Sequence, residues 1–205
     1  AYEALSESHG EDWRAWPPAL QDPASAEVAA FARAHADRIR WHAWLQWQAE
    51  VQLAAAQAAA TGAGMALGLY LDIAVGVRPG GAETWASPAA FARGVSLGAP
   101  PDALNSQGQA WGLAPYDPEG LRALRYAPFR EMLRAAMHHA GVVRIDHVIG
   151  LDRCFWVPED GTPGGYVKYP TEMLMALVRI EAAKRGCVVV GEDLGTVPDG
   201  LRDRL

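Results

Sequence analysis

Apolar residues gather into three short runs along the chain, and each run ends in or beside an acidic residue. The runs cover residues 66–75, 142–147 and 187–192, and they are rich in Leu, Ile and Val. Runs of this length and composition predict buried strands. A helix-like stretch, residues 171–185, separates the second run from the third. Strand, helix and strand in this order predict an α/β fold with a parallel sheet, whose site lies at the carboxyl ends of the strands.

Two further stretches have the three- and four-residue spacing of apolar positions that is typical of helices. Asp22 followed by Pro23 is typical of a helix start, and residues 23–60 predict a long helical stretch that bends or divides near Arg38. Residues 129–140 predict a second helix, ended by the following glycine. Glycine and proline interrupt the first 22 residues, which we expect to be irregular.

The helical spacing also predicts which side chains are buried. We expect Trp41, Trp44 and Trp47 to pack in the core or to be half exposed, and the pair His138 and His139 to lie on a helix surface. The helix over 171–185 is expected to bury Met173, Leu174, Leu177, Val178 and Ile180.

Residues 76–126 have little helical or strand-like pattern and are rich in glycine and proline. A loop of this length inside a compact domain is usually functional, and its aromatic content argues against disorder. Asp102, Gln109 and Trp111 combine polar side chains with an aromatic plate, an arrangement that suits a carbohydrate. The alternative is a rigid loop in which Trp111 forms a small core of its own.

Composition excludes several classes of partner. The chain has 205 residues and a formal net charge of −6, which argues against nucleic acid and anionic membranes as partners. No apolar stretch is long enough to span a bilayer. The two cysteines, Cys154 and Cys187, form neither a disulfide framework nor a metal-binding spacing. We therefore expect a cytoplasmic protein with no metal and no cofactor.

The second apolar run carries the most suggestive chemistry. Because side chains alternate along a strand, Arg144 and Asp146 should point to one face and His147 to the other. A guanidinium beside a carboxylate favours the ionised carboxylate, which a carboxylate nucleophile requires. Paired acids on neighbouring strand ends, here Asp146 with Glu192 or Asp193, suit glycoside chemistry. A structural ion pair at a strand end is the alternative.

Several segments taken in order resemble the motifs of 4-α-glucanotransferases, the amylomaltase or disproportionating enzymes related to the α-amylase barrels. They are Leu69–Val77, Arg144–His147 and Gly191–Gly195, together with the loop segments Gly98–Asp102, Gly108–Gly112, Tyr116–Asp117 and Val167–Pro170. The resemblance covers roughly residues 38–205.

This resemblance implies a retaining transfer between α-1,4-glucans and gives the residues their roles. Asp146 matches the nucleophile, Glu192 the general acid/base, and Arg144 the arginine that keeps the nucleophile ionised. The residues implied to contact the glucan are His147, Asp102, Gln109, Trp111, Asp72 and Asp193. The implied partners are maltooligosaccharides and other α-glucans. Adjacent parallel strands lie about 4.8 Å apart, close to the ~5 Å that separates a retaining carboxylate pair.

The resemblance also implies a partial (β/α)8 barrel. Residues 1–205 would form part of one catalytic domain with about three β/α units, an inserted substrate loop over 76–126 and an N-terminal helical stretch. The family has a third essential carboxylate, in a His-Asp pair on a later strand, and this chain has no counterpart of it. We therefore expect a central part of a larger enzyme, inactive alone.

Two other functions fit the same residues. The chain could be a carbohydrate-binding module without turnover, or part of an α-glucan hydrolase of the α-amylase type. Transfer and hydrolysis differ only in whether a sugar hydroxyl or water reaches the intermediate, which residue spacing does not decide. The sequence makes no prediction of acceptor preference or oligomeric state.

Overall fold

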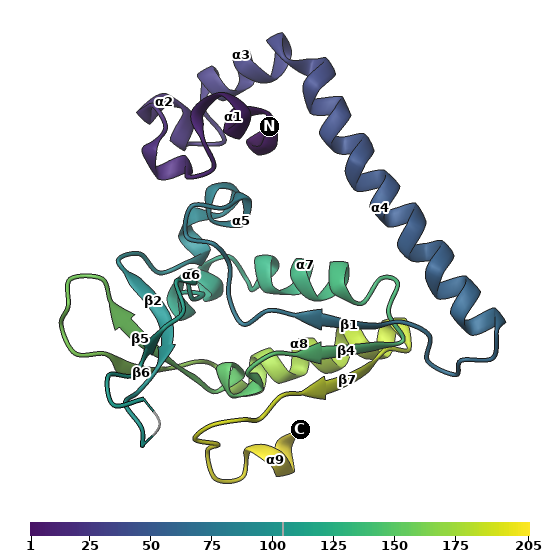
Figure 1. The fold of residues 1–205 in the computed structure, drawn as a ribbon, viewed down its shortest axis with the longest axis vertical. Helices are drawn as coiled ribbons and strands as arrows, with labels where there is room; N and C mark the ends of the chain where they lie inside the picture. The colour runs from purple at the N-terminus through teal and green to yellow at the C-terminus, as the bar shows by residue number, and fades with distance from the viewer. Residues whose placement is uncertain (104) are drawn as a thin grey trace.

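The computed structural model describes residues 1–103 and 105–205, which form α-helices, short 3-10 helices and two sheets (Figure 1). The α-helices are α1 Tyr2–His9, α2 Pro18–Gln21, α3 Ala26–Ala34, α4 Ala36–Gly62, α5 Ala82–Ala86, α6 Pro118–Ala123, α7 Ala127–Ala136, α8 Thr171–Arg185 and α9 Leu201–Arg204. The 3-10 helices are η1 Trp13–Ala15, η2 Pro88–Ala90 and η3 Val148–Leu151. The strands are β1 Tyr70–Ile73, β2 Val95–Ala99, β3 Gln109–Ala110, β4 Val142–Ile145, β5 Arg153–Pro158, β6 Gly165–Lys168 and β7 Val188–Gly191.

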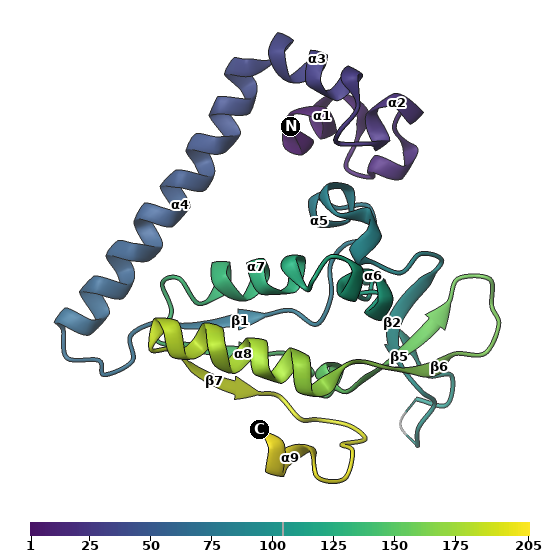
Figure 2. The same cartoon turned by 180° about the vertical axis from the view of Figure 1, so that it is seen from behind.

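The three predicted strands form one parallel sheet in the order β1-β4-β7, as the sequence indicated. Their registers match, so that Ile73, Ile145 and Gly191 lie side by side at the carboxyl ends. Helices α7 and α8 cover one face of this sheet (Figures 1 and 2). The main core fills that layer, because Val143 at the centre of β4 and Leu133 of α7 are fully buried. The fold is therefore α/β with a parallel sheet.

A second, antiparallel sheet was missed by the sequence analysis. Its strand order is β3-β2-β5-β6, and it lies beyond the carboxyl ends of the parallel strands (Figure 1). The prediction of little regular structure over 76–126 was therefore wrong, since this segment also contains α5, η2 and α6. Strand β2 pairs with β5, which follows it more than fifty residues later, and so the local pattern gave no sign of the pairing.

The buried face of α8 also differs from the prediction. Leu174 and Val178 are buried as expected, but Met173 and Ile180 are 46% and 47% exposed. Glu181 occupies the inward position instead, with only 1% exposure, and it is paired with Arg134 of α7 and Arg185. A buried carboxylate is tolerated when guanidinium groups pair with it.

The N-terminal residues form a small second core instead of the predicted irregular segment. Leu5, Trp13, Trp16, Val28 and Trp85 make up its buried cluster. Each tryptophan N–H has a partner: Trp13 donates to Thr84 Oγ1 at 2.9 Å, Trp16 to the Gly10 carbonyl and Trp85 to the Leu20 carbonyl. These bonds allow indole rings to be buried without loss of hydrogen bonding.

The long helical stretch divides at His35, close to the predicted bend, into α3 and α4. The N-cap of α3 is Ser25, whose hydroxyl accepts the Val28 N–H, so the predicted start at Asp22 was wrong. Helix α4 runs from the end of α3 towards the start of β1 (Figures 1 and 2) and has no buried residue.

The α4 tryptophans are half exposed, which is one of the two arrangements expected for them, and none lies in the core. Trp41, Trp44 and Trp47 are 44%, 45% and 57% exposed. None of the described helices is both long enough and apolar enough to cross a membrane.

The buried and exposed faces of α8 provide a stability test within one helix. Leu174→Ala should lower the free energy of unfolding by about 2–5 kcal/mol, because it removes a side chain that is 2% exposed from the main core. Ile180→Ala, its matched control, should change that free energy by about 0.5 kcal/mol or less. Urea unfolding followed by circular dichroism measures both. Equal losses would show that the burial of α8 is wrongly assigned.

Candidate active site

An arginine joins two carboxylates at the carboxyl ends of β1 and β4. Nη1 of Arg144 donates to both oxygens of Asp72, at 2.9 and 2.8 Å, and Nη2 donates to Oδ1 of Asp146 at 2.7 Å. Asp72 and then Asp146 hold the pKa of Arg144 above its usual value. The Asp146 side chain is 40% exposed, so it is fixed in place and still open to solvent. Arg144 and Asp146 share a face, as strand alternation predicted.

Glu192 follows β7 immediately and is held by backbone amides. Its Oε2 accepts the His147 N–H at 2.9 Å, and its Oε1 accepts the Leu194 N–H at 2.8 Å. The backbone is tied as well, because the Glu192 N–H donates to the Ile145 carbonyl and the Glu192 carbonyl accepts the Val148 N–H. The ladder between β4 and β7 thus extends to the residues that carry the two acids.

His147 stands where the chain leaves β4. Its φ of 49° and ψ of 58° lie in the left-handed region, which non-glycine residues adopt at a cost. This turn ends the strand and aims the His147 N–H at Glu192. The strained residue therefore links the strand carrying Asp146 to the acid on the next strand.

The His147 ring meets the predicted substrate loop. It packs edge-on against Trp111, with ring centroids 5.3 Å apart, and Trp111 Nε1 donates to Gln109 Oε1 at 2.9 Å. Burial lowers the pKa of His147, and the charges of Glu192 and Asp146 oppose that shift. Asp102 lies in the loop between β2 and β3, where its Oδ1 accepts the Asn105 N–H. The fold thus brings Gln109 and Trp111 to His147.

Asp193 points away from Glu192, as expected for adjacent residues, and pairs with Arg202 of α9 at 2.5 Å. The sequence analysis missed two residues that hold the loop carrying these acids. Arg153 donates to the Thr196 carbonyl, and Tyr166 shares a hydrogen bond with the Thr196 hydroxyl at 2.8 Å. Both come from the antiparallel sheet, whose existence would have had to be predicted first.

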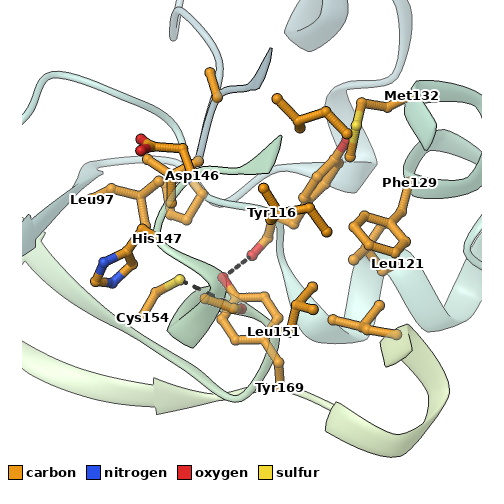
Figure 3. Close-up of a pocket in the computed structure, with 17 residues that line it drawn as sticks. Leu97, Tyr116, Leu121, Phe129, Met132, Asp146, His147, Leu151, Cys154 and Tyr169 are labelled. Carbon is orange, nitrogen blue, oxygen red and sulfur yellow. Dashed lines mark hydrogen bonds between the residues drawn. The ribbon is translucent and has the colours of Figure 1, made fainter. Parts of the chain in front are cut away.

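A cavity of about 60 Å³ lies beneath the site and is mostly apolar. Asp146 and His147 stand at its edge, whereas Leu121, Phe129 and Tyr169 line its interior (Figure 3). The Tyr169 hydroxyl donates to the Tyr116 carbonyl at 2.6 Å and fixes one wall. Its lining is mostly apolar and offers few partners for sugar hydroxyls, whereas the Asp146 carboxylate points away from it (Figure 3).

Within the described residues, the carboxylates at these strand ends do not belong to a group of three donors close enough to share a metal ion. Arg144 supplies the positive charge between Asp72 and Asp146 instead. Two carboxylates that follow neighbouring parallel strands, here Asp146 and Glu192, are the kind of pair that glycoside-cleaving proteins use.

The comparison with known families agrees with this class. Residues 1–205 match the family model described as 4-alpha-glucanotransferase. The chain therefore belongs to the 4-α-glucanotransferase family. It is 49% identical over 204 residues to the 4-alpha-glucanotransferase of Mycobacterium tuberculosis strain H37Rv, and 45% identical over 195 residues to that of Haemophilus influenzae. These alignments cover 98% and 94% of the chain but 28% of each relative.

Two solved structures are similar to this one. Amylomaltase from Corynebacterium glutamicum is 43% identical, with a TM-score of 0.74 over 78% of this chain and 23% of that one. Amylomaltase from Streptococcus agalactiae in complex with acarbose has a TM-score of 0.86 over the whole of this chain and 43% of that one. At 19% identity the second similarity concerns the fold alone.

The lowered pKa of His147 can be measured directly. A histidine-resolved NMR titration should give a value below 6.5, so that the ring is neutral at pH 7 and gains its proton only in more acidic solution. Asp146→Asn should lower it further, because the Asp146 charge raises the pKa of His147. A value above 6.5, or a rise in the variant, would contradict this account of the ring's surroundings.

Proposed function

We propose that this protein is a 4-α-glucanotransferase that transfers segments between α-1,4-glucans by a retaining double displacement. The bridge from Arg144 to Asp72 and Asp146, beside Glu192 on the next parallel strand, is the observation that supports it most. Membership of the family supports the reaction class. The chain spans 28% of the length of the Mycobacterium tuberculosis and Haemophilus influenzae relatives.

In the first displacement, an oxygen of Asp146 attacks the anomeric carbon of the donor glucan. The glycosidic bond breaks as Glu192 passes a proton to the departing oxygen, which leaves a glycosyl ester on Asp146. Arg144 holds the Asp146 carboxylate in place for attack through its hydrogen bond. Each oxygen of Glu192 accepts one backbone N–H and retains a second lone pair, which can hold the transferred proton.

In the second displacement, Glu192 removes the proton from a 4-hydroxyl of an acceptor glucan. That oxygen attacks the anomeric carbon, the ester bond to Asp146 breaks, and an α-linked product forms with overall retention. A neutral His147 ring can hydrogen-bond to a sugar hydroxyl at this point, and Trp111 beside it offers an apolar face for a sugar ring. Gln109 and Asp102 would extend the groove along the loop, and Asp72 and Asp193 would border it.

We also propose that β1, β4 and β7 are neighbouring strands of a (β/α)8 barrel and that residues 1–205 form part of one catalytic domain. The matched parallel registers and the α7 and α8 layer support this assignment. Tyr70, Val188 and Val190 are exposed on the face opposite the helices, where a closed barrel would have its interior. Residues 1–205 alone would then be inactive, because three strands do not enclose a site.

The two acids can be separated by their kinetics. Asp146→Asn should abolish transfer from maltooligosaccharides and from α-glucosyl fluoride alike, because the amide lacks the charge of the attacking carboxylate oxygen. Glu192→Gln should lose about 10²–10⁴-fold in kcat/KM on maltooligosaccharides and much less on α-glucosyl fluoride, whose leaving group needs no proton. Asp193→Asn is the matched control. If Asp193→Asn shows the split and Glu192→Gln does not, the roles are reversed.

The groove can be tested by binding. Trp111→Ala should weaken maltoheptaose binding to the otherwise inactive Asp146→Asn protein by about tenfold, the equivalent of ~1.4 kcal/mol, because it removes the apolar plate beside His147. Trp47→Ala, an exposed tryptophan on α4, is the control. Isothermal titration calorimetry measures both, and an unchanged affinity in Trp111→Ala would remove Trp111 from the groove.

A further inference from the structure

Away from the carboxyl ends of the strands, a cluster just beyond the C-terminal end of α7 contains three side chains that commonly bind metals. Glu50 lies in the middle of α4, and His138 and His139 follow the end of α7. Oε1 of Glu50 is 3.0 Å from Nδ1 of His138 and 2.8 Å from Nε2 of His139. All three donor atoms lie within 4.8 Å of one another. The histidine pair alone gave no metal spacing, because its third donor comes from a distant helix.

The contacts differ from those of an ordinary hydrogen-bonded pair. Nε2 of His139 is buried and makes no hydrogen bond within the described residues, although a carboxylate oxygen lies 2.8 Å away. The imidazoles of His138 and His139 stack, with centroids 4.2 Å apart and an interplanar angle of 12°. Two ring nitrogens thus crowd one carboxylate oxygen, and one of them lacks a well-directed bond. A ligand bound by all three groups would give the unsatisfied His139 nitrogen a partner.

We propose that Glu50, His138 and His139 form a binding site for a divalent transition-metal ion of the zinc class. Two imidazole nitrogens and one carboxylate oxygen are a donor set that Zn²⁺ accepts, with water in the fourth position. Tetrahedral bonds of about 2.0–2.1 Å separate donors by roughly 3.3 Å, close to the distances between Glu50 and the two rings. The stacked rings must open so that their lone pairs converge, and the His138 side chain, 61% exposed, is free to turn.

A metal here would anchor α4 to the core. Helix α4 has no buried residue and is held at its ends by polar contacts. Arg38 pairs with Glu7 near one end, and near the other Gln57 accepts the Leu69 N–H. Glu50 lies between these points, facing the turn between α7 and β4. A bound ion would therefore fix the middle of the helix beside the strand that carries Asp146.

The test uses the full-length protein, freed of metal with a chelator and titrated with ZnCl₂ by calorimetry. The native protein should bind one more Zn²⁺ than Glu50→Gln or His138→Gln, or bind it at least about tenfold more tightly. Added Zn²⁺ should raise the Tm of the native protein and leave the Tm of both variants unchanged. Co²⁺ should give a tetrahedral absorption band in the native protein alone.

The control is His42→Gln. His42 contacts Glu7 at 2.9 Å, which is also a histidine-carboxylate contact on α4 but has no second imidazole. This variant should bind Zn²⁺ as the native protein does. Equal stoichiometry and affinity in the native protein, Glu50→Gln and His138→Gln would overturn the proposal, as would no Zn²⁺ binding by the native protein. Because His138 is largely exposed, His138→Gln decides the question if Glu50→Gln fails to fold.

Discussion

The parallel pairing of β4 with a strand on each side is the constraint on which the candidate site depends. Because Ile73, Ile145 and Gly191 are aligned, the residues that follow them leave the sheet at the same edge. Backbone bonds continue this alignment past the strands, from Asp146 to the Ile73 carbonyl and from Glu192 to the Ile145 carbonyl. Shifting one strand by a single residue would turn its side chains to the opposite face and separate the acids.

The charged residues of the site lie on the face of the parallel sheet that α7 and α8 do not cover. The face under α7 and α8 is filled by apolar side chains such as Val143, so an arginine there would have to lose its hydration. Arg144 lies instead on the other face, where Asp72 and Asp146 neutralise it. The fixed position of Asp146 follows from two strands, since Asp72 comes from β1 and Arg144 from β4.

The second sheet supplies the parts of the site that the parallel strands lack. It carries Gln109 and leads into Trp111, which meets His147, and it holds the loop after β7 through Arg153 and Tyr166. A rigid sheet at the strand ends thus positions two loops from opposite sides. Residues 2–34 pack against α5 through Trp85, whereas α4 has no buried residue and is held by polar contacts. The Glu50 cluster is therefore the most informative place to examine how α4 is fixed.

The sequence by itself determined the parallel strands, the helices that cover them and the acids at their ends, because these follow from local patterns of apolar residues. Arg144 and Asp146 were placed on one face by strand alternation alone. Only the tertiary structure decided which partners meet across the chain. The pairing of β2 with β5, the inward position of Glu181 in place of Ile180, and the approach of Glu50 to His138 and His139 all join distant segments. A local sequence pattern does not predict such contacts, because they form only when folding brings distant segments together.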